Sequence, residues 1–132
     1  MFNNQEDIKD QKTSDVGIIS LRNDGIITFE PKKGKTTHTL EAMKFELDIF
    51  QKWAGDNKLG FISDNRNLKR FDSDVRVYAQ QHLHLFCNKF ALIISSGISS
   101  FLTNMFIYIN KPKVPVRAFT SREEAINWIK DA

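Results

Sequence analysis

The chain has 132 residues, of which 41% are hydrophobic, 11% aromatic and 27% charged. This length predicts a single domain that buries about two-thirds of its surface on folding, and the composition excludes a disordered, collagen-like or disulfide-scaffold protein. The formal net charge of +3 permits an acidic partner without requiring one. Because Lys and Arg are scattered among carboxylates, we expect no nucleic-acid-binding surface.

The N-terminal segment is polar and charged and has no apolar run typical of a signal peptide. We therefore expect residues 1–15 to form a flexible arm, residues 16–132 to form one domain, and the protein to be cytoplasmic. The single cysteine, Cys87, cannot form an intramolecular disulfide. We expect it to be a small buried side chain rather than a reactive nucleophile.

The first predicted element is an antiparallel hairpin. Apolar runs at 16–21 and 26–29 flank an Asn-Asp-Gly turn at 23–25, which is a strong hairpin signal. A helix follows, capped by one of two threonines, Thr37 or Thr39, and ended near Gly55. Its apolar arc is wide, so we expect it to contact the sheet and also a neighbouring helix or another subunit.

A second helix is predicted after a short strand at 59–62, with Asp72 or Ser73 as its cap. Its apolar positions follow the helical period: Val75, Tyr78, Ala79, His82, Leu85 and Phe86. The continuous apolar run at 89–95 is typical of a central parallel strand covered on both faces. A last strand at 116–119 leads into a capping box at 120–123 and a final helix through Ile129.

The segment 91–109 contains no charged residue and has to be tested as a membrane span. A strand, a serine-rich turn and an amphipathic helix from Ile98 to Ile109 explain its pattern better, so we expect no membrane-spanning segment. The whole order predicts an α/β fold: an N-terminal β-hairpin followed by alternating helices and mostly parallel strands, with about five strands and four helices.

That order resembles the STAS domain of bacterial anti-sigma-factor antagonists, and more closely a set of small bacterial SpoIIAA-like proteins. The residues that carry the resemblance are Asp24, Gly25, Asp64, residues 91–96, Asn104, Phe106, residues 110–112, Pro115, Phe119, Thr120, Glu124, Ala125 and Trp128. The resemblance implies a SpoIIAA-like sandwich and a non-enzymatic regulatory or protein-interaction module with a protein partner. The Sec14-like branch of this fold implies the alternative, a binder of a lipid or another small amphipathic ligand.

The same resemblance makes Ser73 a candidate phosphoacceptor. In antagonists of the STAS kind a partner kinase phosphorylates the first serine of an Asp-Ser-Ser-Gly pattern at a helix N-terminus. This chain has Asp74 and Val75 in place of the second serine and the glycine. The neighbouring carboxylates repel phosphate, and the sequence favours a plain helix cap over a phosphorylation site.

A serine-rich turn follows the strand at 89–95 and is a candidate anion-binding site, because free N–H groups and hydroxyls meet at such turns. Its residues are Ser95, Ser96, Gly97, Ser99 and Ser100. A structural turn that caps the next helix is the alternative. The basic residues of two loops are expected at the same end of the sheet, where they could form an electropositive rim: Lys32, Lys33, Lys35, Arg66, Lys69 and Arg70.

No catalytic or cofactor-binding motif is recognisable. His82 and His84 have no Cys, Asp or Glu at zinc-site spacing, so we expect no metal site. We expect His82 to be a hydrogen-bonded core or interface residue and His84 to be solvated. No nucleophile elbow or dinucleotide fingerprint occurs, so we expect neither catalysis nor a cofactor.

Self-association is expected from the apolar helix at 98–109. It has too little polar surface to bury all of its apolar side chains against one sheet. A homodimer with Phe106, Ile107 and Tyr108 near the interface would cover the remainder. Phe45 and Trp53 on the first helix are the alternative dimer surface.

Overall fold

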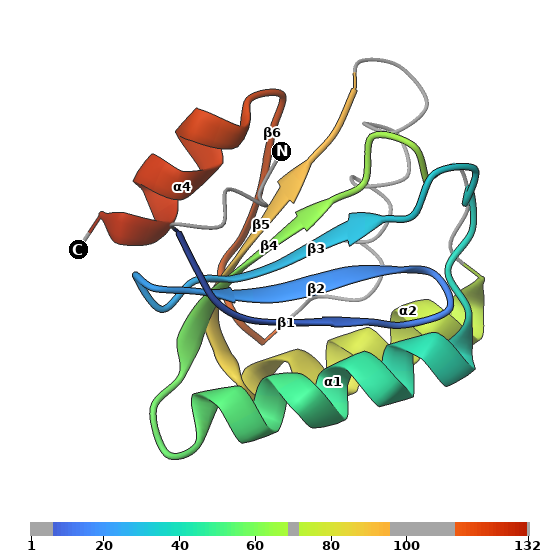
Figure 1. Ribbon diagram of the computed structural model, residues 1–132, viewed down its shortest axis with the longest axis horizontal. Helices are drawn as coiled ribbons and strands as arrows, with labels where there is room; N and C mark the ends of the chain where they lie inside the picture. Colours follow the sequence, from blue (N-terminus) through green and yellow to red (C-terminus); the bar gives the residue numbers. More distant parts are fainter. Residues whose placement is uncertain (1–6, 69–71, 96–112, 132) are drawn as a thin grey trace.

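A single mixed sheet organises the computed structural model, which describes residues 7–68, 72–95 and 113–131. Its six strands lie side by side in chain order, from β1 to β6 (Figure 1). The strands are β1 (Ile8–Thr13), β2 (Gly17–Arg22), β3 (Ile27–Pro31), β4 (Leu59–Asp64), β5 (Cys87–Ile93) and β6 (Val116–Phe119). The pairs β1–β2 and β2–β3 are antiparallel, and β3 to β6 are parallel, which confirms the predicted hairpin followed by parallel strands.

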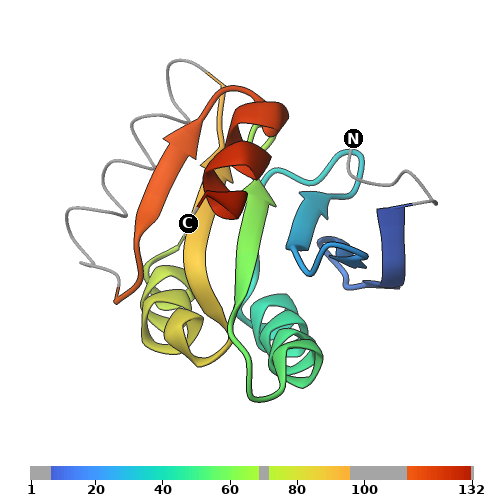
Figure 2. The ribbon, with the colours of Figure 1, turned by 90° about the vertical axis from the view of Figure 1, so that its left-hand side faces the viewer.

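Helices cover both faces of the sheet. On one face lie α1 (Leu40–Ala54) and α2 (Ser73–His82), with the short 3-10 helix η2 (Leu83–Leu85) continuing α2. On the opposite face lies α4 (Arg122–Lys130), packed over β4, β5 and β6 (Figure 2). The described part of the chain is therefore a three-layer arrangement with the sheet in the middle.

Two apolar cores lie on the two faces of the sheet. The larger core, beneath α1 and α2, contains a cluster of aromatic rings around Phe50. The ring centroid of Phe50 is 5.0 Å from that of Phe61 and 5.1 Å from that of Phe86, and Phe61 stacks on Phe90 at 4.9 Å. The smaller core, beneath α4, consists of Ile26, Ile62, Ala91, Ile93, Phe119 and Ala125.

Side-chain caps and one glycine set the helix ends. Thr39 caps α1, since its Oγ1 accepts a hydrogen bond from the backbone N–H of Ala42 at 3.2 Å. Gly55 ends α1 at φ +59°, a left-handed conformation that favours glycine. Ser121 caps α4 by accepting from the N–H of Glu124 at 3.3 Å, one residue later than the predicted box.

The sheet has six strands where the sequence predicts about five, because residues 8–13 of the expected flexible arm form β1. An edge strand with mostly exposed side chains has no apolar alternation to reveal it. Its pairing with β2 and a hydrogen bond at 3.0 Å from Trp53 Nε1 to Asp10 Oδ2 hold it in place.

The second helix is shorter than predicted. Beyond His82 the chain tightens into η2, so Leu83 is buried and Leu85 is 44% exposed, although the helical period places Leu85 on the buried stripe. The reason is the change from 3.6 to 3.0 residues per turn, which rotates the following side chains.

Three of the four predicted α-helices fall in the described residues, as α1, α2 and α4. The fourth, expected from Ile98 to Ile109, lies outside them. No helix within residues 7–68, 72–95 and 113–131 has both the length and the apolar character that crossing a membrane requires.

Candidate functional site

Ser73 is the first residue of α2 and is exposed, and Asp72 precedes it as the N-cap residue. The carboxylate of Asp74 accepts a hydrogen bond from the backbone N–H of Val75 at 2.8 Å. The hydroxyl of Ser73 is therefore accessible at the positive end of a helix, with a carboxylate beside it that disfavours a second anion.

The serine turn and the predicted dimer surface fall mostly outside the described residues. Ser95 is exposed just beyond the end of β5. The residues that lie outside are Ser96, Gly97, Ser99, Ser100, Phe106, Ile107 and Tyr108. Anion binding and self-association through these residues therefore stay predictions.

The loops after β3 and β4 lie at the same end of the sheet, as expected, because these two strands are parallel. Arg66, however, forms a bidentate salt bridge with Asp64, from Nε to Oδ1 at 2.9 Å and from the terminal nitrogen to Oδ2 at 2.6 Å. These hydrogen bonds raise the pKa of Arg66 and orient its guanidinium toward the protein's own carboxylate.

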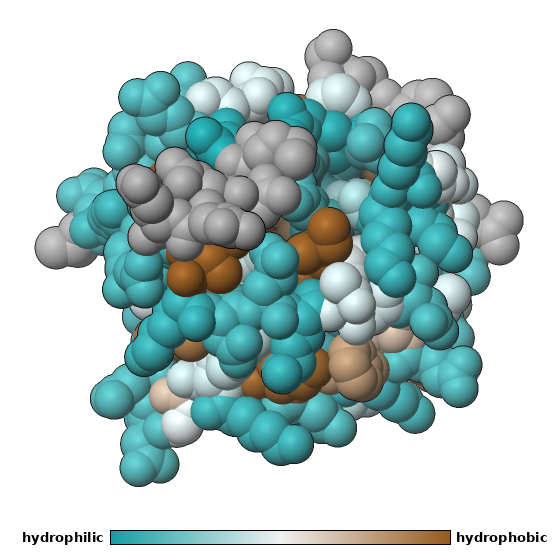
Figure 3. All heavy atoms as spheres, in the orientation of Figure 1, coloured by the Kyte–Doolittle hydropathy of each residue, from teal (hydrophilic) through white to brown (hydrophobic). Residues whose placement is uncertain are grey.

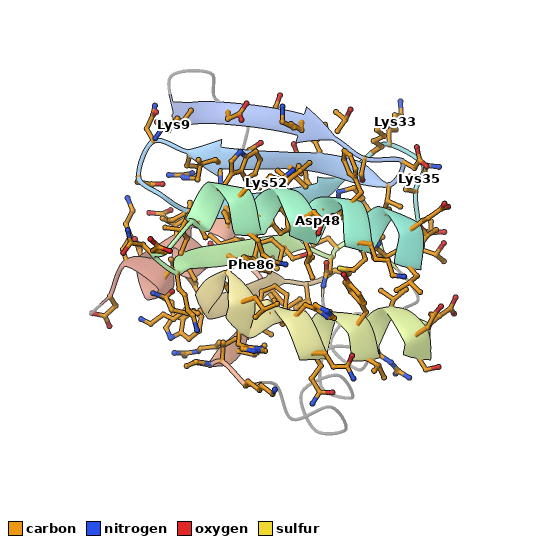
Figure 4. All side chains as sticks on the ribbon, turned by 90° about the horizontal axis from the view of Figure 1, so that it is seen from below. Lys9, Lys33, Lys35, Asp48, Lys52 and Phe86 are labelled. Atoms are coloured by element: carbon orange, nitrogen blue, oxygen red, sulfur yellow. The ribbon has the colours of Figure 1, made fainter. Side chains whose placement is uncertain are left out.

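Glu30 adds a second acidic group to this end of the sheet. Its burial, together with the negative charge of Asp64, raises its pKa. Lys33 and Lys35 lie together near the start of α1, well away from Lys9 (Figure 4), and Lys69 and Arg70 lie outside the described residues. The expected basic rim is therefore partly neutralised where the structure describes it.

Two apolar side chains are exposed on α2 and η2. Val77 is 42% and Leu85 44% exposed, and the exposed Gln81 lies four residues from each. Tyr78 and His82 border these residues, with stacked rings 3.9 Å apart. We call these five residues the outer α2 face.

His82 and Tyr78 are fixed by contacts within the helical layer. His82 Nδ1 lies 2.8 Å from the carbonyl oxygen of Tyr78, and the ammonium of Lys44 on α1 lies 5.8 Å from the Tyr78 ring. This confirms the prediction of a hydrogen-bonded histidine. It also gives the outer α2 face two rings that are held in one conformation.

A buried polar cluster links the β1–β2 turn, the loop before α1 and α1 itself. Ser14 Oγ donates to Glu46 Oε2 at 2.6 Å, and His38 Nε2 lies 2.9 Å from Glu46 Oε1. Ser14 Oγ also accepts from the N–H groups of Val16 at 3.1 Å and Gly17 at 3.0 Å. The exposed fractions of Ser14, His38 and Glu46 are only 6%, 4% and 2%.

The order of groups in this cluster differs from that of a catalytic triad. Glu46 lies between the serine and the histidine, and its carboxylate accepts a hydrogen bond from the hydroxyl of Ser14. This cluster was not predicted from the sequence. One feature of the sequence could have indicated it: Glu46 is a charged residue on the buried stripe of α1 that also contains Met43, Leu47 and Phe50.

Cys87 and His84, two further candidates from the sequence, differ in their burial. Cys87 is buried, as predicted, and burial raises the pKa of its thiol to about 12. His84 is half-buried rather than solvated, and its Nδ1 is enclosed without a hydrogen-bond partner. Burial and the nearby Lys113 and Lys58 lower the pKa of His84. The part of the chain that the structure describes holds no cluster of His, Cys, Asp and Glu that could bind a metal ion.

Two shallow hollows lie between elements of the described chain. One, of about 350 Å³, lies beside the buried cluster and is lined by Thr13, Ser14, Asp15, Lys32, Glu41, Ala42 and Phe45. The other, of about 520 Å³, lies between β6 and α4 and is lined by Arg117, Phe119, Glu124, Asn127, Trp128, Lys130 and Asp131. The face seen in Figure 3 is mostly hydrophilic with small apolar patches.

The two residues of the alternative dimer surface on α1, Phe45 and Trp53, differ in their exposure. Phe45 is 46% exposed. Trp53 is half-buried against β1, where its indole donates to Asp10. Only Phe45 of this pair therefore presents a largely open ring.

Comparison with solved structures supports the fold. A protein from Shewanella loihica PV-4, described as an uncharacterised member of the DUF3478 family with a SpoIIAA-like fold, is similar over 91% of this chain and 90% of its own. The TM-score is 0.54 at 13% sequence identity. A protein of unknown function from Arthrobacter sp. FB24 is 23% identical over 85% of this chain and 91% of its own, with a TM-score of 0.29.

The sequence comparisons identify the family of the chain through one family model. Comparison with curated proteins gave no match. The family model that matches is not that of the STAS domain, so the resemblance to STAS proteins is supported at the level of the SpoIIAA-like fold. The matching model is DUF7793, a domain of unknown function, which covers residues 19–132, and the chain therefore belongs to the DUF7793 family.

Proposed function

We propose that this chain is a non-enzymatic regulatory or protein-interaction module that acts in the cytoplasm and binds a protein partner through the outer α2 face. The observation that carries the proposal is the exposure of Val77 on α2 and of Leu85 on η2, at 42% and 44%. Apolar side chains that are flanked by fixed aromatic rings gain most from burial against a partner.

The state of the nucleophilic groups supports a role without catalysis. A thiol with a pKa of about 12, as in Cys87, stays protonated and unreactive at neutral pH. The hydroxyl of Ser14 is buried and donates to Glu46, so it is neither accessible nor next to a free base.

Affinity capture from the native host tests the proposal. The wild-type chain is compared with a double variant, Val77→Glu with Leu85→Glu, and with the matched control Gln81→Glu, which adds a charge between the two positions. A protein retained by the wild type and by Gln81→Glu, but lost by the double variant, supports the proposal. Equal recovery with all three chains, or no protein enriched over an unrelated domain, contradicts it.

The alternative is a binder of a lipid or another amphipathic ligand. The hollow between β6 and α4 favours it, because the rings of Phe119 and Trp128 lie 5.8 Å apart beside the guanidinium of Arg117. Mass spectrometry of lipids extracted from the captured chain distinguishes the two functions. A lipid present in the wild type and lost in Trp128→Ala supports the alternative.

A further inference from the structure

Three basic side chains lie at the end of the sheet where the parallel strands β4, β5 and β6 begin. Lys58 directly precedes β4, His84 lies in η2 just before β5, and Lys113 lies three residues before β6. Because parallel strands begin at the same edge of a sheet, these three segments are neighbours. We call Lys58, His84 and Lys113 the basic cluster.

Backbone hydrogen bonds hold these segments side by side. The N–H of Leu59, next to Lys58, donates to the carbonyl oxygen of Phe86 at 2.9 Å, two residues after His84. The N–H of Phe90 on β5 donates at 2.9 Å to the carbonyl oxygen of the residue that precedes β6. The sheet therefore fixes the backbone at all three positions of the basic cluster.

The positive charges of the basic cluster are not neutralised within the chain that the structure describes, where no carboxylate forms an ion pair with any of the three side chains. Lys58 and Lys113 are exposed, and His84 is half-buried. Burial lowers the pKa of His84, and the charges of Lys113, Lys58 and His82 lower it further. A carboxylate bound here would be attracted by all three side chains and would relieve their mutual repulsion.

The basic cluster adjoins the outer α2 face. His84 and the exposed Leu85 are consecutive residues of η2, and His82 of the outer α2 face is one of the charges that act on His84. The Nδ1 atom of His84 is enclosed, so a ligand can reach only Nε2. A partner that covers Leu85 therefore lies beside the basic cluster.

We propose that the basic cluster binds an acidic side chain of the protein partner that covers the outer α2 face. Lys58 and Lys113 supply ammonium donors to the carboxylate, and His84 supplies the N–H of Nε2. The formal net charge of +3 favours the approach of an acidic partner. The inference rests on the proposed function for the source of the carboxylate, whereas carboxylate binding itself can be measured without the partner.

The first test titrates the full chain with a tetraglutamate peptide at pH 6 and fixed ionic strength. We expect the NMR signals of the His84 ring and of the Lys58 and Lys113 amides to shift as the peptide binds. Lys58→Gln with Lys113→Gln should weaken binding roughly 2- to 30-fold, because each exposed ion pair contributes modestly. The matched control, Lys33→Gln with Lys35→Gln, removes two exposed lysines near the start of α1 and should leave the shift of the His84 ring unchanged (Figure 4).

The pH dependence of peptide binding is a second readout. A bound carboxylate favours the imidazolium form of His84, so the peptide should raise the pKa of His84 and bind up to tenfold more tightly per unit of falling pH around that pKa. The charged groups around the ring are Lys58, Lys113 and His82, and the exposed Asp56 lies two residues before Lys58. His84→Asn keeps a donor and should flatten this dependence.

Unshifted signals of the His84 ring, or equal binding of the peptide by the wild type and by Lys58→Gln with Lys113→Gln, would overturn the proposal. Either result leaves the outer α2 face as a separate claim, because no residue of the basic cluster belongs to that face.

Capture from the native host tests the source of the carboxylate. A partner that is lost by Val77→Glu with Leu85→Glu, and is recovered less by Lys58→Gln with Lys113→Gln than by the lysine control, supports the proposal. Full recovery by Lys58→Gln with Lys113→Gln would overturn the inference and keep the proposed function. No captured partner would overturn both, while the peptide titration still measures the site.

Discussion

Ile129 on α4 packs directly over Gly60 on β4, so that a Cβ atom at position 60 would overlap the side chain of Ile129. The close approach lets α4 lie against the sheet above the smaller apolar core. Gly60 is therefore a packing requirement of the fold rather than a turn residue.

Gly60→Ala is expected to displace α4 and to lower the free energy of unfolding by about 1–3 kcal/mol, the usual range for overpacking a core. Urea denaturation measures the loss. Adding Ile129→Ala to Gly60→Ala should recover part of it, because the second change removes the overlapping atoms. Purely additive effects of the two substitutions would show that Ile129 is not the obstacle.

Trp53→Phe tests what holds β1 on the sheet. The change keeps an aromatic ring and removes the indole N–H that donates to Asp10 at 3.0 Å. That hydrogen bond is the main cause that lowers the pKa of Asp10, so the variant should raise this pKa in an NMR titration. The amides of β1 should also exchange faster with solvent. An unchanged pKa would mean that the bond does not form in solution.

Asp24 in the β2–β3 turn is expected to stabilise the fold at neutral pH and to lose this effect in acid. Burial favours its neutral form, but hydrogen bonds from Arg22 and Lys130 outweigh burial and lower the pKa of Asp24 to about 2. A lowered carboxyl pKa stabilises the fold above the ordinary value of 3.8, and this contribution is lost as pH falls toward about 2.

Asp24→Asn should keep the turn, because asparagine is a common residue in such turns, and remove the ion pairs. We expect a loss of under about 1 kcal/mol at pH 7, since the pair is partly exposed. The difference between the variant and the wild type should shrink as pH falls below 3.8 and disappear only below about pH 2, where the carboxyl of the folded protein is protonated. A difference that persists well below pH 2 would assign the effect to the turn itself.

Much of the fold could be predicted from local signals. The Asn-Asp-Gly turn, Thr39 at the start of α1 and Gly55 at its end each act within a few residues of themselves. The apolar run of β5 likewise marks a strand buried on both faces. The order of elements followed from these signals.

The features that the sequence analysis missed depend on contacts between distant residues. Ser14 and Glu46 are 32 residues apart, and Asp10 and Trp53 are 43 residues apart. A polar edge strand and a buried carboxylate look like surface segments until their partners are known. The exposure of Leu85 could not be predicted either, because it depends on where α2 tightens into η2.

Self-association is a separate prediction from the sequence. Light scattering at micromolar concentration should give about twice the chain mass of 15.3 kDa, and Ile107→Glu should return it to that mass. A dimer that survives Ile107→Glu but dissociates in Phe45→Glu would move the interface to α1, where Phe45 is 46% exposed. A mass of one chain at all concentrations would contradict self-association.

Photo-crosslinking in the native host tests whether a protein partner binds the outer α2 face. A photoreactive residue replaces Gln81, which is exposed between Val77 and Leu85, or Glu123, which is exposed on α4 on the opposite side of the sheet. We expect a discrete protein adduct from position 81 that is absent from position 123 and is lost when Val77→Glu and Leu85→Glu are added. No adduct from position 81, or the same adduct from both positions, would contradict it.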